Sequence, residues 1–211
     1  MIKCFGSDDK RLIQIGSYSL CEFYMRYDEF TEVILKVKEL NEEQVKAILY
    51  MAVIYLKYEE YRDKAKEIIL KYKNVEGTGG SPLSRIFSDK LVDVERDSEF
   101  LIEIMKSKVG RRIVYFFVRF LEENACSIRD YAEIVLALCG SVLGMDSELI
   151  ANRLGIENYI SKLIIALYDE SANSEKESDK KIAERCLELW DNMFEKQIGQ
   201  VRALSRELME R

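Results

Sequence analysis

Aspartates at helical spacing are the residues of this sequence best suited to metal chemistry. Asp89, Asp93 and Asp97 recur every four residues and could share one helix face, where carboxylates can hold Mg²⁺ for a phosphorylated substrate. Acidic residues at this spacing are also typical of a solvated face paired with lysine and arginine. We therefore expect no metal site and no cofactor, and keep a compact Mg²⁺-dependent helical enzyme as the alternative. A second acidic set has similar spacing: Glu184, Glu188 and Asp191.

Histidine is absent from all 211 residues, which removes several kinds of catalytic site. Ser-His-Asp and Cys-His nucleophile systems, His-ligated zinc and the Glu-x-x-His di-iron bundle are excluded. The stretch EGTGGSP does not fit a phosphate-binding loop, because it lacks the required glycine spacing and the Lys-Ser or Lys-Thr pair. The sequence therefore predicts a protein that is not an enzyme.

The cysteines predict ordinary reduced thiols. An odd number at wide, irregular gaps, without a C-x-x-C pair, fits neither a disulfide framework nor a zinc knuckle. The first residues, MIKCFGSDDK, contain no apolar signal region, and the longest apolar run, Ile48 to Leu56, is too short to cross a bilayer. We expect a cytoplasmic protein with no membrane partner. The five cysteines are Cys4, Cys21, Cys126, Cys139 and Cys186.

A basic cluster is the best candidate in the sequence for binding a partner. On one helix, Lys108, Arg112 and Arg119 would fall near one face and could bind a phosphate group or an acidic protein. Nearby glutamates could equally make this an ordinary charged face. The formal net charge of -6 argues against nucleic acid as the partner. The cluster comprises Lys106, Lys108, Arg111, Arg112 and Arg119, and the last four are the candidate partner-binding residues.

Composition and periodicity predict an all-α fold. One proline and ten glycines leave few residues for the tight turns of a β-sandwich, and 48% hydrophobic residues suffice for a core. Asn41 with Gln44 is close to a capping box, which predicts a helix start there. Apolar residues at helical spacing predict helices over 8–26, 29–40, 42–58, 59–73, 82–92, 98–107, 111–123, 127–142, 156–170 and 179–211.

The main break in the helical pattern is NVEGTGGS, residues 74 to 81, which precedes a helix start at Ser81-Pro82. We interpret 1–211 as a single helical-repeat domain, with a hinge at 74–81 between an N-terminal half, 1–73, and a C-terminal half, 82–211. Helices in pairs with no sheet to cover can form a closed bundle or an open solenoid.

A loose internal repeat favours the solenoid. DDKRLIQIGSYSLCEFY (8–24), KSKVGRRIVYFFVRFLEE (106–123) and ESDKKIAERCLELWDNMFE (177–195) share a charged start and an aromatic-rich end, as in the second helix of a HEAT unit. The fold class we predict is therefore an all-α, HEAT-like α-solenoid of paired antiparallel helices.

The chain also resembles the helical, HEAT-like region at the C-terminal end of large bacterial P-loop ATPases of the STAND or NACHT type. The segments that carry this resemblance are GSYSLCEFYMRYDEF (16–30), SPLSRIFSDKLVDVERDSEFLIEIMKS (81–107) and CLELWDNMFEKQIGQVRALSRELMER (186–211). The resemblance implies a bacterial protein-binding module, a scaffold or the sensor part of a defence system. The ATPase module of such proteins is not in this sequence.

The C-terminal stripe predicts a capping helix. Leu187, Trp190, Phe194, Ile198 and Val201 recur at helical spacing, and Leu204 and Leu208 continue the stripe after Gly199, which could kink the helix. We expect Trp190 to be largely buried against the helix at 156–170. If Trp190 is exposed instead, a homo-oligomeric adaptor that pairs through this last helix becomes the better interpretation.

Overall fold

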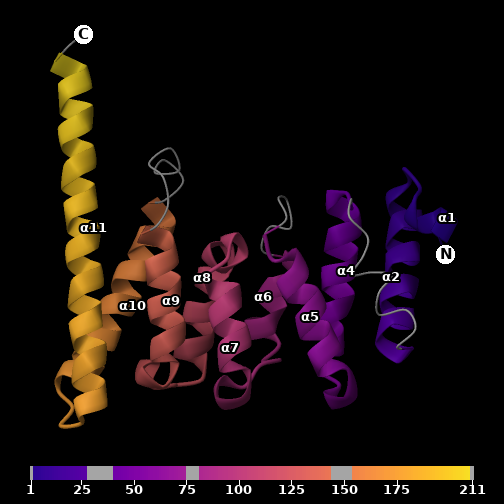
Figure 1. The fold of residues 1–211 in the computed structure, drawn as a ribbon, viewed down its shortest axis with the longest axis horizontal. Coiled ribbons are helices and arrows are strands. Elements are labelled where there is room, and N and C mark those ends of the chain that lie inside the picture. Colours follow the sequence, from indigo (N-terminus) through magenta and orange to yellow (C-terminus); the bar gives the residue numbers. More distant parts are fainter. Residues whose placement is uncertain (1, 28–39, 75–80, 144–153, 210–211) are drawn as a thin grey trace. The chain divides into compact units, whose positions relative to one another are not determined.

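The computed structural model describes residues 2–27, 40–74, 81–143 and 154–209 and is all-α in these ranges, with no strand among them. It divides into two compact units, Met1–Phe120 and Leu121–Arg211, each considered by itself. No helix in the described ranges combines the length and hydropathy needed to cross a bilayer. The all-α prediction is confirmed (Figure 1).

The helices of the first unit follow the sequence periodicity closely. The capping box predicted at Asn41 is confirmed: Asn41 Oδ1 accepts from Gln44 N at 2.9 Å, and Gln44 Oε1 accepts from Asn41 N at 2.8 Å. The elements are α1 (Ile2–Phe5), α2 (Lys10–Arg26), α4 (Glu42–Tyr55), η2 (Glu59–Tyr61), α5 (Arg62–Tyr72), α6 (Ser81–Ser88), α7 (Val94–Met105) and α8 (Lys108–Glu123), the last of which continues into the second unit.

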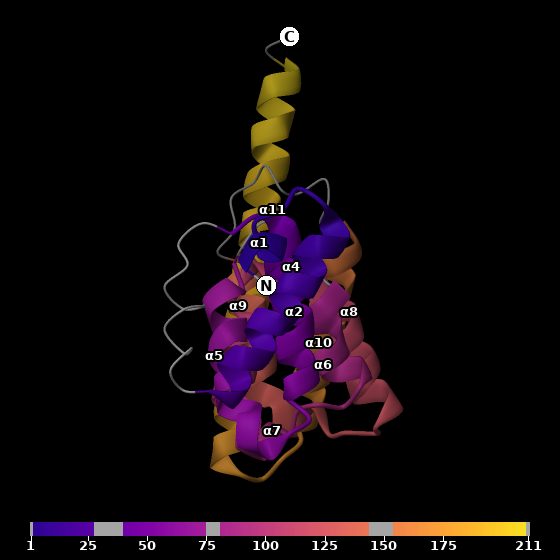
Figure 2. The ribbon, with the colours of Figure 1, turned by 90° about the vertical axis from the view of Figure 1, so that its right-hand side faces the viewer.

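Contacts in the first unit link several helices that are close together in the chain. Helix α4 contacts α2, α5 and α6, and α5 contacts α7; Figure 2 shows α2 lying beside α4. The core includes Phe87, whose ring centroid is 5.1 Å from that of Phe117 and 5.7 Å from that of Phe120. Most of Ile48–Leu56 is enclosed, as its uniformly apolar sequence predicts.

One predicted helix end in this unit differs from the structure. In helix α2, Ile13, Leu20 and Tyr24 are buried, whereas Leu12 and Ile15 are exposed. The helix predicted over 82–92 ends at Ser88, because Lys90 takes a left-handed backbone (φ 52°) and Leu91 N donates to Ile86 O at 3.0 Å. The predicted helix at 29–40 lies almost wholly outside the described residues.

The predicted hinge also lies largely outside the described residues, since 75–80 are not among them. Contacts of α4 with α6 and of α5 with α7 join the segments on either side of it. The hinge and the division into halves at 74–81 stay predictions.

The second unit contains η3 (Ile128–Tyr131), α9 (Ala132–Leu143), α10 (Leu154–Ala172) and α11 (Glu177–Met209). Helix α11 contacts both α9 and α10. Gly199 neither ends nor splits α11, so the closing helices predicted at 179–211 are one helix of 33 residues. At a rise of about 1.5 Å per residue, α11 is roughly 50 Å long and α10 roughly 28 Å. Figures 1 and 2 show α11 continuing past the end of α10.

Candidate functional site

The fold separates the three aspartates that the alternative Mg²⁺ site would require. Asp89 follows the end of α6, Asp93 is the N-cap of α7, and Asp97 lies in the first turn of α7, so the three do not share one helix face. Asp93 Oδ1 accepts from Glu95 N at 2.9 Å, and Asp89 Oδ2 accepts from Arg85 Nη2 at 2.6 Å. In the described part of the chain, no group of three or more cysteine, aspartate or glutamate residues is placed to hold a metal ion.

Asp97 instead anchors a buried ionic network. Its carboxylate accepts from Arg62, and Lys66 Nζ lies 2.7 Å from its Oδ1. Asp93 N donates to Asp97 Oδ2 at 2.9 Å. Burial acts to raise the pKa of Asp97, but the bonds from Arg62, Lys66 and Asp93 outweigh burial and hold that pKa below its ordinary value.

The guanidinium of Arg62 is also used within the fold. It donates to Leu56 O at 2.5 Å and to Leu91 O at 2.7 Å, which ties the end of α4 and the α6–α7 connection to α5. A polar hollow of about 560 Å³ lies beside this network, and Arg62 lines it. Because Arg62 bonds to two carbonyls and a carboxylate, its role here is structural.

Three of the five cysteines carry little reactivity. All five are free, and Cys21, Cys139 and Cys186 are buried. Burial raises the pKa of Cys21 and of Cys139 to about 12 and that of Cys186 to about 11. These three thiols are therefore protonated at neutral pH, and the protonated thiol is a poor nucleophile.

The basic candidates all lie on one helix, as predicted, because Lys108, Arg111, Arg112 and Arg119 belong to α8. The side chains of the first three lie outside what the structure describes. Arg119 is exposed, and its guanidinium carbon lies 5.9 Å from the centroid of the Tyr115 ring. Their role in binding a partner stays a prediction.

Lys106, at the start of the basic cluster, is partly neutralised. Its Nζ lies 3.7 Å from Glu103 Oε1, and Lys73 Nζ lies 2.6 Å from Glu103 Oε2. Glu103 therefore offsets part of the cluster's charge, as its place in the sequence predicts.

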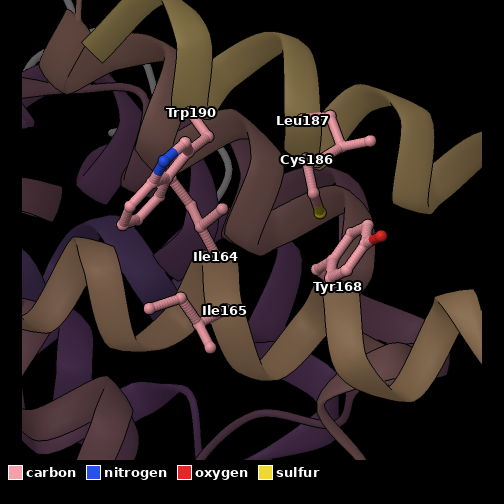
Figure 3. A pocket seen from close by; sticks show the side chains of 6 residues that line it. All are labelled: Ile164, Ile165, Tyr168, Cys186, Leu187 and Trp190. Carbon is pink, nitrogen blue, oxygen red and sulfur yellow. The ribbon is translucent and has the colours of Figure 1, made fainter. Parts of the chain in front are cut away.

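An apolar groove between α10 and α11 is the strongest candidate site in the described residues. It has a volume of about 170 Å³ and is lined by Ile164, Ile165, Tyr168, Cys186, Leu187 and Trp190 (Figure 3). Ile165 is 47% exposed, Leu187 48% and Trp190 38%. An apolar cavity of roughly 150 Å³ accepts a benzene-sized group, so this groove can take one large apolar side chain.

The exposure of Trp190 corrects the prediction that it is largely buried. Trp190 does lie beside α10, because it lines the groove with Ile164 and Ile165. The buried face of α11 includes Ala183 and Cys186, and Leu187 lies one residue, or about 100°, around the helix from Cys186. Helix α11 thus carries apolar residues outside the face that packs within its own unit. This wider apolar surface is the signal that sequence reasoning missed.

The floor of the groove is the packed core of the second unit. Helix α10 buries Ile160, Leu163, Ile164 and Leu167, at the spacing of one helix face. The next residue after Ile164, Ile165, then projects at the rim of the groove. The apolar contacts between α10, α11 and α9 therefore fix where the rim residues stand.

An ion pair and hydrogen bonds hold the two helices that form the walls of the groove, α10 and α11, in place. Arg129 of η3 lies 3.0 Å from Asp179, near the start of α11, and Ser174 donates to Asp179 at 2.6 Å. The bond from Ser174 holds the pKa of Asp179 below its ordinary value, against a smaller opposing effect of burial, and Arg129 adds to this lowering. Ser127 donates to Glu170 of α10 at 2.6 Å. The groove is therefore formed by fixed elements, not by loops.

Comparison with known protein families, with curated proteins and with solved structures finds no match to this chain. What the chain does must therefore be argued from its own residues.

Proposed function

We propose that the chain is a non-enzymatic protein-binding or scaffold module whose binding surface is the α10–α11 groove. The observation that carries this proposal is the exposure of Ile165, Leu187 and Trp190 around one apolar hollow. Covering side chains that are about half exposed gains on the order of 1 kcal/mol each. Tryptophan is enriched among residues that dominate binding energy at interfaces, so Trp190 is the expected anchor of a bound partner.

The finer fold assignment is part of this proposal. We propose a HEAT-like solenoid of paired antiparallel helices, supported by contacts between alternate helices: α4 with α6, α5 with α7, and α9 with α11. Stacked helix pairs need such contacts, since each pair covers the apolar face of the next. In a solenoid the groove of the second unit would belong to the stacked surface with which such proteins bind partners.

The resemblance to STAND or NACHT-type ATPases supplies a biological context for the proposal. It would make the groove part of the sensor or scaffold region of a bacterial defence system. This context rests on the resemblance alone, and the test of binding below does not depend on it.

Photo-crosslinking from the groove tests the proposed function. We expect a benzophenone amino acid in place of Leu187 to give a covalent protein adduct on irradiation of cells that express the full chain. The same amino acid in place of Asn192, which is exposed on the outer side of α11, is the matched control and is expected to give little adduct. Denaturing electrophoresis and mass spectrometry measure both the yield and the identity of the adduct.

Two comparisons make this experiment decisive. Trp190→Ala should reduce the adduct from position 187, because the substitution removes the expected anchor. Equal adduct from positions 187 and 192, or none from either, would contradict a binding role for the groove.

A further inference from the structure

We infer that the α10–α11 groove binds a second copy of this chain, with the two α11 helices antiparallel. This inference rests on the proposed function, because it names the partner of the same groove. It starts from two facts about α11: the helix extends past α10, and its rim residues Leu187 and Trp190 are exposed.

The sequence of α11 continues the exposed stripe in a heptad pattern. With Leu187 at position a and Trp190 at d, the later a and d positions are Phe194, Gln197, Val201, Leu204 and Leu208. Backbone helix is continuous across all of them. Six of these seven positions are apolar over three heptads, which is the pattern of a helix that pairs with another helix. The single polar position is Gln197.

Charge along α11 selects an antiparallel second copy. From 184 to 195 there are four acidic residues and one basic residue, a net charge of -3. From 196 to 206 there are three basic residues and no acidic one, a net charge of +3. An antiparallel pair sets each acidic segment beside the basic segment of the other copy, whereas a parallel pair sets like charges together.

The antiparallel arrangement also satisfies the heptad register. With the two-fold axis between Glu195 and Lys196, residues 184–195 are level with residues 196–207 of the second copy. Leu187 is then level with Leu204 of the second copy, Trp190 with its Val201 and Phe194 with its Gln197, so a positions meet d positions. Each α11 therefore brings residues 201 and 204 to the groove of the other copy, which gives two identical contacts, as a symmetric dimer requires.

The oligomeric mass of the purified full chain tests the inference. Light scattering should give about twice 24.7 kDa for the parent chain and about 24.7 kDa for Leu204→Glu at the same concentration. Asn192→Glu adds the same charge on the outer side of α11 and should stay dimeric. Circular dichroism of all three proteins shows whether the helices are intact. A parent chain that is monomeric at 100 μM, or a dimer that Leu204→Glu does not weaken, would overturn the inference.

The antiparallel direction of the two α11 helices is tested by the salt dependence of the dimer and by the site of the crosslink. The antiparallel dimer should dissociate more readily as NaCl is raised, because salt screens its complementary charges. The adduct from position 187 should map to residues 201–211 of a second copy. An adduct between two positions 187, or a dimer that salt tightens, would contradict the antiparallel pair. An adduct with a different protein would refute the second copy as partner but leave the proposed binding function standing.

Discussion

Asp97→Asn is expected to lower the free energy of unfolding by about 3–5 kcal/mol, the usual cost of removing one partner from a buried ion pair. The side chain of Asp97 is fully buried, and its removal as an anion leaves the buried Arg62 and the partly buried Lys66 without this counterion. Denaturant unfolding followed by circular dichroism measures the loss. The loss of stability is large because the substitution leaves buried positive charge uncompensated. It does not measure the net contribution of the intact ion pair to stability.

Asp89→Asn is the matched control for this substitution. Asp89 pairs with Arg85 on the protein surface, four residues away, and such pairs contribute about 0–1 kcal/mol. Equal small losses from both substitutions would show that Asp97 is not the anchor we describe.

Acid should erase the difference between the parent and the Asp97→Asn variant. The pKa of Asp97 is lower in the folded chain than in the unfolded one, so its stabilising effect is complete above the ordinary value of 3.8. That effect is lost as pH falls through the folded pKa, below 3.8. We therefore expect a constant stability gap from about pH 5 to 8 and a shrinking gap below about pH 4.

Gly110→Ala is expected to lower the free energy of unfolding by about 3 kcal/mol, the upper end of the usual range for substitutions that overpack a core. Gly110 lies near the start of α8, and a Cβ there would stand 2.5 Å from both Cα and O of Met105 and 2.6 Å from Ile104 O. These are backbone atoms at the end of α7, so the clash can be relieved only by moving the helices apart. Gly110 N also donates to Ser107 Oγ at 3.4 Å, a bond that such a movement would break.

Gly140→Ala is the control for Gly110→Ala. Gly140 lies within α9, and a Cβ there meets nothing within 4 Å. Alanine should stabilise that helix by about 0.5–1 kcal/mol, since glycine is the poorer helix former. Thermal melts of the two variants should therefore move in opposite directions, and a harmless Gly110→Ala would contradict the close approach of α7 and α8.

Local signals in the sequence predict the helices well. The capping box at Asn41 and Gln44 requires only four consecutive residues, and both of its bonds are present. The stop at Ser88 was missed because no glycine marks it: Lys90 adopts the left-handed conformation that glycine usually takes. The presence of the helices can therefore be predicted from the sequence, whereas some helix ends cannot.

Pairings between distant segments could not be read in the same way. Asp97 meets Arg62, which lies 35 residues earlier, and nothing local distinguishes it from the exposed Asp89. The groove likewise requires Ile165 and Trp190 to stand side by side on two helices. Periodicity assigned Trp190 to the core. The reason is that an apolar stripe has the same sequence pattern whether it packs within its own unit or binds a partner.

The fluorescence of Trp190 tests the central claim, that the α10–α11 groove is a protein-binding surface which a second copy covers. Trp190 is the only tryptophan in the chain and lies in the groove, so its emission reports on this surface alone. On dilution of the full chain through the dissociation of the dimer, its emission should shift to longer wavelength and acrylamide quenching should increase. A spectrum and a quenching constant that stay unchanged while light scattering shows the dimer dissociate would contradict the account.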